Sequence, residues 1–543
     1  MSASATPVDA AARERIRTQV GQNMLVEAGA GTGKTTSLVA RITEVLASGQ
    51  ATVDELAVIT FTNKAAAELS ARVRERLEEA LGGETDPGRR ARLAAAVRGL
   101  YRARIETIHS FATSLLRERP VEAGLDPEFR ALSDLESELM FERAFGEWLT
   151  RTLAEDRPEI ARALHLGIGP DELRAAALEV HRHRYLLPLE PFEGVPDAEA
   201  EVFRWLDRNR AELEQLRADC DPESRAYPYI EAVLDYADEL EALGRGSVEA
   251  ARRLRAGLPK VNRNVGRQSD FASPEQCQRW KKELAAEWQE LAGRVPGQMG
   301  TEALLAVLPL VEEFVRDYEQ ERRAEGVADY DDLIIWSRDL VRDRPEVRDY
   351  FRQRFRAILI DEFQDTDPIQ VELALYLASD SEDVGEWRRL RPVDGKLFVV
   401  GDPKQSIYRF RRADIAIYDE VKAGALDGCH ERIEQNFRSA PRLIEWVNRA
   451  FETLFEERTG LQPASAPLVP SPFPEGIERP PVVVVRGEYP EADAGAVRER
   501  EAQALAAVLR EAVTGNEPWI VRDSGPGRLR EPTWRDVAIL LPQ

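Results

Sequence analysis

Residues 28–35 read AGAGTGKT and follow the apolar run Met24-Leu25-Val26, from which they are separated by Glu27 alone. After a strand, the glycines at 29, 31 and 33 let the backbone turn tightly with its N–H groups pointing inward, and a helix that opens at Lys34 adds its N-terminal dipole. Four apolar residues support that helix by recurring on one face of it: Leu38, Ile42, Val45 and Leu46. This succession of strand, loop and helix predicts an α/β fold with a cradle for polyphosphate.

The side chains of this phosphate loop (residues 28–35) predict what it holds. Lys34 can reach the β and γ phosphates of a nucleoside triphosphate, and the hydroxyl of Thr35 is placed to ligate Mg²⁺. The first position, Ala28, departs from the usual G-x-x-x-x-G-K-[ST] pattern, but the last four residues require the same geometry. A glycine-rich turn without a ligand is the alternative. We predict that the nucleotide is bound by Ala28, Gly29, Ala30, Gly31, Thr32, Gly33, Lys34, Thr35 and Thr36.

Two carboxylates follow another predicted strand. The apolar residues 357–360, AILI, come directly before Asp361 and Glu362. Ligands bind at the carboxyl ends of strands in open α/β sheets, so Asp361 is placed to hold Mg²⁺ through water opposite Thr35. Glu362 is then the candidate base that orients and deprotonates the attacking water, which is the only proton transfer that phosphoanhydride hydrolysis needs. The alternative is the common preference for acidic residues at a helix N-terminus.

The apolar pattern divides the chain into an interrupted α/β domain and a helical block. Short apolar strands alternate with amphipathic helices over residues 23–130, including a strand at 56–61, and strand signals return at 357–360 and 397–400. Long charged stretches between them, such as 134–153 and 201–216, predict a helical insertion. Within it, residues 258–276 carry Lys260, Arg263 and Arg267 and form either a solvated loop or a nucleic-acid contact.

A second α/β domain is predicted near the end of the chain. A helix at 441–455 and a proline-rich connection at 462–481 precede a strand at 482–485, a helix at 499–513 and a strand at 536–542. No helix follows to cover the last strand, so we expect this domain to be incomplete. The expected domains are residues 1–129 and 326–429 for the two parts of the first α/β domain, 130–325 for the insertion, and 430–543 for the second domain.

Length and composition limit the class of protein. A chain of 543 residues exceeds one ordinary core and suggests about three or four domains. The three cysteines, Cys220, Cys277 and Cys429, lie far apart, which argues against a disulfide scaffold and against zinc or iron–sulfur clusters. No apolar run approaches the roughly 20 residues of a membrane span, and the N-terminus lacks a signal-peptide core. We therefore expect a cytoplasmic protein that does not contact membranes.

One basic segment stands out in an acidic chain. The formal net charge of −23 opposes nucleic-acid binding in general, but residues 404–412, KQSIYRFRR, carry four cations interleaved with aromatic residues. In an extended conformation Tyr408-Arg409-Phe410-Arg411 would place like residues on one side, where bases could stack on rings while arginines neutralise phosphates. The alternative is an edge strand whose aromatic side chains lie in the core.

Six motifs occur in the order of one known family: AGAGTGKT (28–35), TFTNKAAAEL (60–69), TIHSFA (107–112), DEFQDTDPIQ (361–370), VGDPKQSIYRFRRADI (400–415) and QNFRSAPRL (435–443). In these motifs the chain resembles the UvrD/RecB-type superfamily 1 DNA helicases, and it is more similar to the RecB and AddA helicase–nuclease branch than to UvrD and Rep. The resemblance covers residues 23–120 and 326–455. It implies a P-loop NTPase with a RecA-like motor domain, a helical insertion, and an incomplete second RecA-like domain.

The resemblance also implies roles for individual residues. Besides Lys34 and Glu362, the catalytic set would include Gln405, which senses the γ-phosphate and links it to the DNA groove, and Arg438, which contacts the γ-phosphate from the second motor domain. Phe437, where the family often has Tyr, would stack on the adenine of ATP. The single-stranded DNA track would comprise Phe61, Thr62, Asn63, His109, Tyr408, Phe410 and Arg411.

The sequence departs from the family pattern at several positions. Ala10 stands where many relatives carry a Gln that reads adenine, and Thr36 stands where relatives can carry Arg. The later family motifs do not occur between Arg438 and Gln543, so we expect a fragment or a truncated gene product.

The resemblance implies an ATP-dependent translocase on single-stranded DNA. It would use ATP and Mg²⁺ to unwind duplex DNA, 3′ to 5′, in repair or recombination, together with a helicase–nuclease partner subunit. The alternative is a truncated, non-catalytic ATP- and DNA-binding module or partner subunit.

Overall fold

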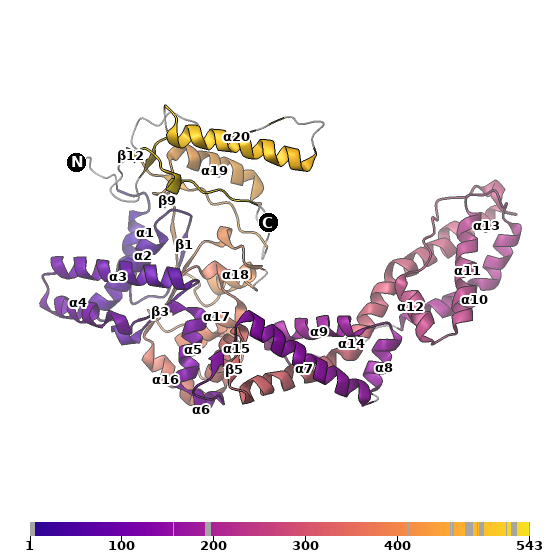
Figure 1. The fold of residues 1–543 in the computed structure, drawn as a ribbon, viewed down its shortest axis with the longest axis horizontal. Helices are drawn as coiled ribbons and strands as arrows, with labels where there is room; N and C mark the ends of the chain where they lie inside the picture. The colour runs from indigo at the N-terminus through magenta and orange to yellow at the C-terminus, as the bar shows by residue number, and fades with distance from the viewer. Residues whose placement is uncertain are drawn as a thin grey trace. The chain divides into compact units, whose positions relative to one another are not determined.

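The computed structural model of this chain describes residues 6–155, 157–189, 197–409, 412–456, 458, 461–472, 482–485, 487, 493–516, 519–522 and 529–541. The chain forms two compact units, one of Met1–Leu115 with Ser337–Gln543 and the other of Leu116–Trp336 (Figure 1). The predicted domain boundaries at 129, 325 and 429 stay predictions.

A parallel sheet of six strands is the centre of the first unit. Its order is β3-β2-β6-β7-β1-β8, and every neighbouring pair is parallel. The strands are β1 (Met24–Ala28), β2 (Leu56–Thr60), β3 (Arg104–Thr107), β6 (Ala357–Ile360), β7 (Leu397–Gly401) and β8 (His430–Ile433). Because all six run in one direction, their carboxyl ends and the loops after them share one edge of the sheet. The predicted strands at 24–26, 56–61, 357–360 and 397–400 are confirmed, the second without Phe61.

Helices cover the sheet on both faces. The first unit contains α1 (Ala10–Thr18), α2 (Lys34–Ser48), α3 (Asn63–Gly83), α4 (Pro87–Gly99), α16 (Pro345–Arg354), α17 (Pro368–Ala378), α18 (Ile415–Ala423), α19 (Pro441–Leu454) and α20 (Ala494–Thr514). The boundaries between the units fall within two more helices, α5 (Ile108–Glu118) and α15 (Tyr330–Asp343). The predicted helices that begin at Lys34, near Thr62 and at Pro441 are therefore confirmed, as is the one at 499–513.

Side chains that alternate along each strand point to opposite faces of the sheet, so the apolar core lies in two layers, each between the sheet and a set of helices. Met24 and Val26 of β1 pack in one cluster with apolar residues of α1, α2, α3 and α4. That cluster includes Leu38 and Ile42, whose complete burial contributes about 1.5–3 kcal/mol each, and Leu69, Val73 and Leu77 at the predicted helical spacing. Strand residues of the opposite parity face the other side of the sheet, where Phe111 of α5 lies 5.3 Å, ring centre to ring centre, from Phe355.

The end of the chain differs from the prediction. Residues 482–485 and 537–541 form no strand, so the predicted strands at 482–485 and 536–542 are wrong for the described residues. A strand needs hydrogen bonds to a neighbouring strand and a surface to cover its side chains. Among the described residues no strand pairs with these segments, and Val484 is 67% exposed and Leu540 93% exposed. The strands described after β8 are short and form two pairs: β9 (Gln435–Asn436) with β10 (Val469–Pro470), and β11 (Val521–Arg522) with β12 (Leu529–Arg530).

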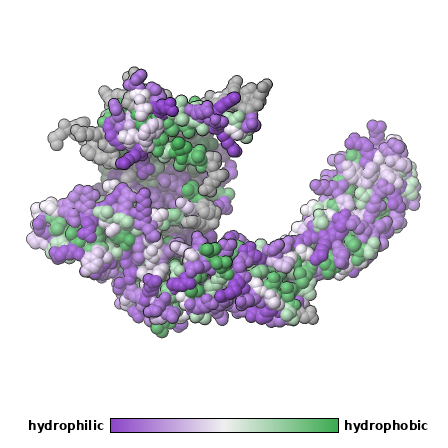
Figure 2. Space-filling model, viewed as in Figure 1, coloured by the Kyte–Doolittle hydropathy of each residue, from purple (hydrophilic) through white to green (hydrophobic). Residues whose placement is uncertain are grey.

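Apolar side chains also remain exposed on α19. Ile444 is its one buried residue, whereas Trp446, Phe451 and Leu454 are exposed. Figure 2 shows hydrophobic residues gathered in this region. The second RecA-like domain remains a prediction for residues 430–543.

The second unit is helical. It contains α6 (Pro120–Ala123), α7 (Asp134–Ala154), α8 (Pro158–His165), α9 (Pro170–Arg182), α10 (Ala198–Asp219), α11 (Tyr227–Leu243), α12 (Val248–Ala256), α13 (Pro274–Arg279) and α14 (Ala285–Ala324). The long helix α14 contacts α7, α8, α9, α10 and α12 and shares one apolar core with them. Here the predicted helices at 134–153 and 201–216 are confirmed, and the only strands described are the short pair β4 (Arg130–Ala131) and β5 (Val327–Ala328).

Candidate functional site

The phosphate loop has the predicted succession of strand, turn and helix. It joins β1 to α2, and Gly31 and Gly33 adopt φ values of 70° and 86°, in the left-handed region that favours glycine. A side chain at Gly31 would also collide with its surroundings, because a Cβ there would lie 2.6 Å from Asn436 Nδ2 and 2.7 Å from Arg438 Cβ. The loop therefore keeps a bare backbone concavity of the kind that receives phosphate at a helix N-terminus.

Acidic residues after β6 face the lysine of this loop. Lys34 Nζ lies 2.5 Å from Glu362 Oε2, although the two residues are 328 positions apart in the sequence. Burial, and next the negative charge of Glu362, raise the pKa of Asp361 from 3.8 to about 6. The same two causes, in the same order, raise the pKa of Asp365 to about 6. The geometry therefore places three carboxyl groups and one ammonium group at the carboxyl edge of the sheet.

This arrangement suits a divalent cation and a polyphosphate. Asp365 Oδ1 is buried and has no hydrogen-bond partner among the described residues. The pKa of Asp361 stays raised although the positive charge of Lys34 opposes the effects of burial and of Glu362. Thr35, in the first turn of α2, and Asp361, directly after β6, both offer oxygen ligands at this edge. Mg²⁺ prefers oxygen ligands and usually needs only one or two carboxylates, since phosphate and water supply the rest.

Asp361 yields a stability prediction. Its folded-state pKa is raised, so the folded protein binds the proton more tightly than the unfolded chain does, and stability falls as the pH rises from about 4 to 6 and stays lower above that range. Replacing Asp361 by Asn should therefore raise the free energy of unfolding by about 2–3 kcal/mol at pH 7.5 in EDTA, and by about half as much at pH 5.

Chemical denaturation at the two pH values measures this gain. The exposed Asp380→Asn is the control, and it should change stability by less than about 0.5 kcal/mol. A stability of Asp361→Asn at pH 7.5 equal to or below that of the wild type would contradict the assigned burial of the charge.

Residues 435–439 lie against the phosphate loop. The Phe437 backbone N–H donates to the Gly31 carbonyl at 2.9 Å, and Asn436 Nδ2 donates to the Ala30 carbonyl at 2.6 Å. Asn436 Oδ1 in turn accepts hydrogen bonds from the backbone N–H groups of Arg438 and Ser439. The structure thus brings Phe437 and Arg438 beside the phosphate loop, and their contact with a nucleotide stays a prediction.

Helix α1 contributes an arginine that the sequence prediction missed. Arg13 Nη2 donates to the Thr32 carbonyl at 2.8 Å, and its guanidinium carbon lies 5.1 Å from the centre of the Phe437 ring. Asp9 orients this arginine through two hydrogen bonds of 2.7 and 2.9 Å. Burial raises the pKa of Asp9, but hydrogen bonds from Arg13 and from the N–H groups of Gln435 and Glu434 outweigh it and lower the pKa. Ala10, the residue at the position where relatives carry Gln, is the first residue of α1.

The predicted DNA-track residues follow the strands at the same edge. Phe61 and Thr62 follow β2, and Thr62 caps α3, which begins at Asn63. His109 lies in the first turn of α5, directly after β3. Tyr408 comes from the loop after β7, and its ring centre lies 4.6 Å from that of Phe61. Phe410 and Arg411 lie outside the described residues. The structure therefore joins Phe61 to Tyr408, from segments far apart in the sequence.

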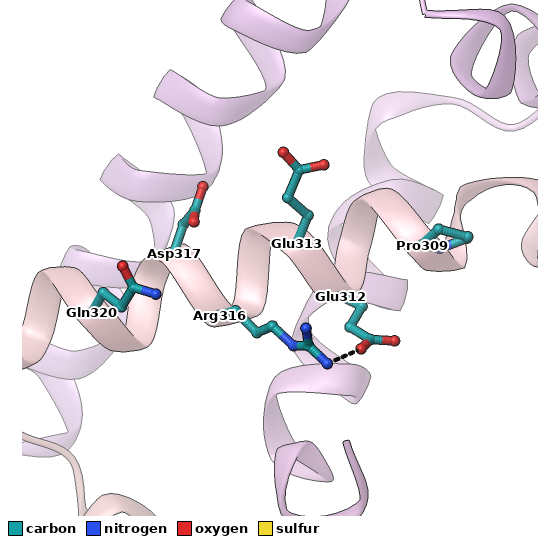
Figure 3. A pocket seen from close by; sticks show the side chains of 6 residues that line it. All are labelled: Pro309, Glu312, Glu313, Arg316, Asp317 and Gln320. Carbon is teal, nitrogen blue, oxygen red and sulfur yellow. Dashed lines mark hydrogen bonds and ion pairs between the residues drawn. The ribbon is translucent and has the colours of Figure 1, made fainter. Parts of the chain in front are cut away.

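The helical unit has a pocket of its own. Its volume is about 360 Å³, it lies on α14 (Figure 3), and it is lined by Pro309, Glu312, Glu313, Arg316, Asp317 and Gln320. The acidic lining, in which Arg316 donates to Glu312, is unsuited to phosphate. In the described part of the chain no three His, Cys, Asp or Glu side chains group to hold a metal by themselves, the three carboxylates after β6 included. No helix there is long and apolar enough to span a bilayer.

Comparison with known proteins identifies the family. The model for the UvrD/REP helicase N-terminal domain matches residues 8–425. The chain is 26% identical over 583 residues to an ATP-dependent helicase/nuclease subunit of Staphylococcus carnosus, and over 592 residues to that of Staphylococcus aureus (strain NCTC 8325); each match covers 96% of this chain and 45% of the relative. The corresponding protein of Listeria welshimeri is 26% identical over 492 residues, which cover 80% of this chain and 38% of the relative.

The chain spans less than half the length of these curated relatives. Their names agree with the predicted resemblance to the helicase–nuclease branch, which is thereby confirmed. Since the family model matches most of its residues, the chain belongs to the UvrD/REP helicase family.

Proposed function

We propose that this chain is the ATP-hydrolysing part of a DNA helicase that moves along single-stranded DNA, 3′ to 5′, in DNA repair or recombination. The contact between Lys34 and Glu362 carries the proposal, because it joins the phosphate loop to a general-base candidate at the edge where ligands bind in parallel sheets. The relatives are named as subunits of a helicase/nuclease, which supports both DNA as the substrate and a partner in a larger complex. The cytoplasmic location stays a prediction.

The residues of the site would divide the work of phosphoryl transfer among them. Lys34 would exchange its contact with Glu362 for the phosphates, and Thr35 and Asp361 would hold the metal. Bound there, Mg²⁺ would neutralise charge on the phosphate oxygens. Glu362, relieved of Lys34, would accept the proton of the attacking water. Arg438, in the segment 435–439, would stabilise negative charge on the transferred phosphoryl group. Phe437 and Arg13 would line the part of the site that holds the adenine of ATP.

ATP hydrolysis would be coupled to DNA through the loop after β7. Gln405 and Tyr408 lie on this loop, and Tyr408 contacts Phe61 from the loop after β2. A change in the loop on ATP binding would therefore reach the aromatic pair that we propose as a stacking surface for bases. Movement follows if the ATP-bound and ATP-free states differ in their affinity for DNA. Preferential unwinding of a duplex with a 3′ single-stranded tail, over one with a 5′ tail, checks the direction.

A non-catalytic ATP- and DNA-binding module or partner subunit is the second candidate. The observation that favours it is that the chain spans less than half the length of its relatives, whose activity can require residues that this chain does not contain. Steady-state ATP hydrolysis with and without single-stranded DNA separates the candidates. The helicase hypothesis predicts that this chain hydrolyses ATP and that DNA stimulates the hydrolysis, whereas the module hypothesis predicts that it binds both ligands without turnover.

Tyr408 tests the proposed DNA track. Replacing it by Ala removes one stacking surface, which is worth about 1–3 kcal/mol per base, so single-strand affinity should fall by roughly 5- to 150-fold. Fluorescence anisotropy with a labelled oligonucleotide measures this, and Tyr408→Phe, which keeps a ring, should bind within about twofold of the wild type. Unchanged affinity of Tyr408→Ala would favour the alternative in which the ring only packs against Phe61.

A further inference from the structure

One buried amide connects the candidate base to the loop after β7. Gln364 is 3% exposed, and its Nε2 donates to Glu362 Oε2 at 2.8 Å and to Asp365 Oδ2 at 3.2 Å. On its other side, Gln364 Oε1 accepts the backbone N–H of Asp402 at 2.9 Å. The side chain therefore touches two carboxylates that follow β6 and one peptide group that follows β7.

These partners allow only one orientation of the amide. Oε1 faces an N–H donor, and Nε2 faces two carboxylates that can only accept when ionised. Rotation of the amide by 180° would turn its oxygen toward both carboxylates and its NH₂ toward the Asp402 N–H. Gln364 can thus hold Glu362 Oε2 at a fixed place relative to the end of β7.

Backbone geometry indicates that Glu362 needs such support. Its φ of 53° lies in the left-handed region, which costs a residue other than glycine on the order of 1 kcal/mol or more and persists where neighbouring contacts enforce it. The local contacts are the Glu362 N–H to Asp361 Oδ1 at 3.0 Å and the Asp365 N–H to the Glu362 carbonyl at 2.9 Å. Gln364 adds the one described contact that also reaches β7.

The loop after β7 is joined to Gln364 by two hydrogen bonds. Besides the Asp402 N–H, Ser406 Oγ donates to the Gln364 carbonyl at 3.1 Å. Gly401 leaves room for the amide, because a Cβ there would lie 2.6 Å from Gln364 Oε1. Asp402 Oδ2 then accepts from Gln405 Nε2 at 2.7 Å. A continuous hydrogen-bonded path therefore runs from Lys34 and Glu362 through Gln364 and Asp402 to Gln405.

We infer that Gln364 is a positioning residue: it orients the Glu362 carboxylate for the attacking water and ties that orientation to the loop that carries Gln405 and Tyr408. The inference rests on the proposed function. It implies that loss of the amide slows the hydrolytic step and weakens its response to DNA while leaving nucleotide affinity intact, because Gln364 donates to Glu362 and not to the phosphate loop.

Gln364→Met in this protein tests the inference, because Met nearly keeps the volume of the side chain but cannot replace the hydrogen bonds of the amide. The kcat for DNA-stimulated ATP hydrolysis should fall by about 10–100-fold, as is typical when the partner that orients a reacting group is removed, and KM for ATP should stay within about twofold. Gly401→Ala would place a Cβ 2.6 Å from Gln364 Oε1 and 3.1 and 3.2 Å from the backbone nitrogens of Gln364 and Phe363. It should displace the same amide together with this backbone and reproduce the loss of kcat, so the test stands even if Gln364→Met does not fold.

Asn23 offers a matched control on the same sheet. It is a buried amide that bridges the Pro392 carbonyl and the Leu397 N–H, at 3.0 and 2.9 Å, at the opposite end of β7. Asn23→Leu should lower the melting temperature yet leave kcat within about twofold. An equal loss of kcat in Asn23→Leu and Gln364→Met would assign Gln364 a general structural role instead.

A double-mutant cycle with Glu362→Gln decides whether Gln364 acts through Glu362. If it does, adding Gln364→Met to Glu362→Gln costs little further activity, whereas independent roles would multiply the two losses. If the wild type is active, then an equally active Gln364→Met variant, or losses that multiply in the cycle, would overturn this inference but not the proposed function. A wild-type protein without any ATP hydrolysis would instead contradict the proposed function.

Discussion

Replacing Lys34 by Ala is expected to abolish DNA-stimulated ATP hydrolysis by this protein, lowering kcat by at least about 10²–10³-fold. The ammonium group lies against the carboxylates after β6, at 2.5 Å from Glu362, and at the start of α2 where the phosphates are expected. Loss of a single preorganised group that stabilises transition-state charge costs that much in other enzymes. Steady-state hydrolysis at saturating single-stranded DNA measures the effect.

A folding measurement and a control variant show whether this loss comes from the missing ammonium group or from unfolding. Lys34→Ala leaves Glu362 close to Asp361 and Asp365 without its cation, so its thermal unfolding has to be compared with that of the wild type. Lys282→Ala, an exposed lysine of the helical unit, is the matched control and should keep full activity. Lys34→Ala that folds normally and still hydrolyses ATP would contradict the assignment of the phosphate loop.

Replacing Arg438 by Ala is expected to lower kcat by about 10³-fold or more. An arginine that reaches the transferred phosphoryl group from a second segment is worth about 10³–10⁵ in other phosphoryl-transfer enzymes. In this chain the Arg438 backbone N–H is fixed by Asn436 Oδ1 at 3.0 Å, and Asn436 is itself bound to the Ala30 carbonyl of the phosphate loop. The backbone of Arg438 is therefore held beside the phosphate loop, and we expect its guanidinium to reach the transferred phosphoryl group from there.

Arg438→Lys should not restore activity, because an ammonium group cannot reproduce the planar fork of guanidinium. Arg449→Ala, on α19, is the control for removing an arginine from this region and should retain wild-type hydrolysis. Nucleotide affinity, measured with a fluorescent ATP analogue, should change much less than kcat in Arg438→Ala. A kcat within about threefold of the wild type would remove Arg438 from the catalytic set.

The sequence predicts the centre of the sheet better than its edges. β1, β2, β6 and β7 are covered on both faces, so they read as continuous apolar runs that a sequence pattern can detect. The edge strands β3 and β8 read RIET and HERI and are only partly buried, which removes that signal. The opposite error occurs at 482–485, where four valines have high strand propensity but no neighbouring strand pairs with them among the described residues.

Site residues divide in a similar way. Lys34, Asp361 and Glu362 are detectable because each follows a strand with a recognisable pattern. Gln364, Asp402 and Asn436 lie within motifs that the sequence displays, yet their roles depend on contacts such as that between Gln364 Oε1 and the Asp402 N–H, 38 positions away. Arg13 carries no motif, and only the packing of α1 brings it to Thr32 and Phe437.

Steady-state ATP hydrolysis by this protein, with and without single-stranded DNA, tests the central claim most directly. We predict that Mg²⁺-dependent hydrolysis rises with added single-stranded DNA in the wild type, and that Lys34→Ala removes it under both conditions. Hydrolysis that does not respond to DNA, or that survives in a folded Lys34→Ala protein, would contradict the proposal that ATP is hydrolysed at the carboxyl edge of the sheet to drive movement along DNA.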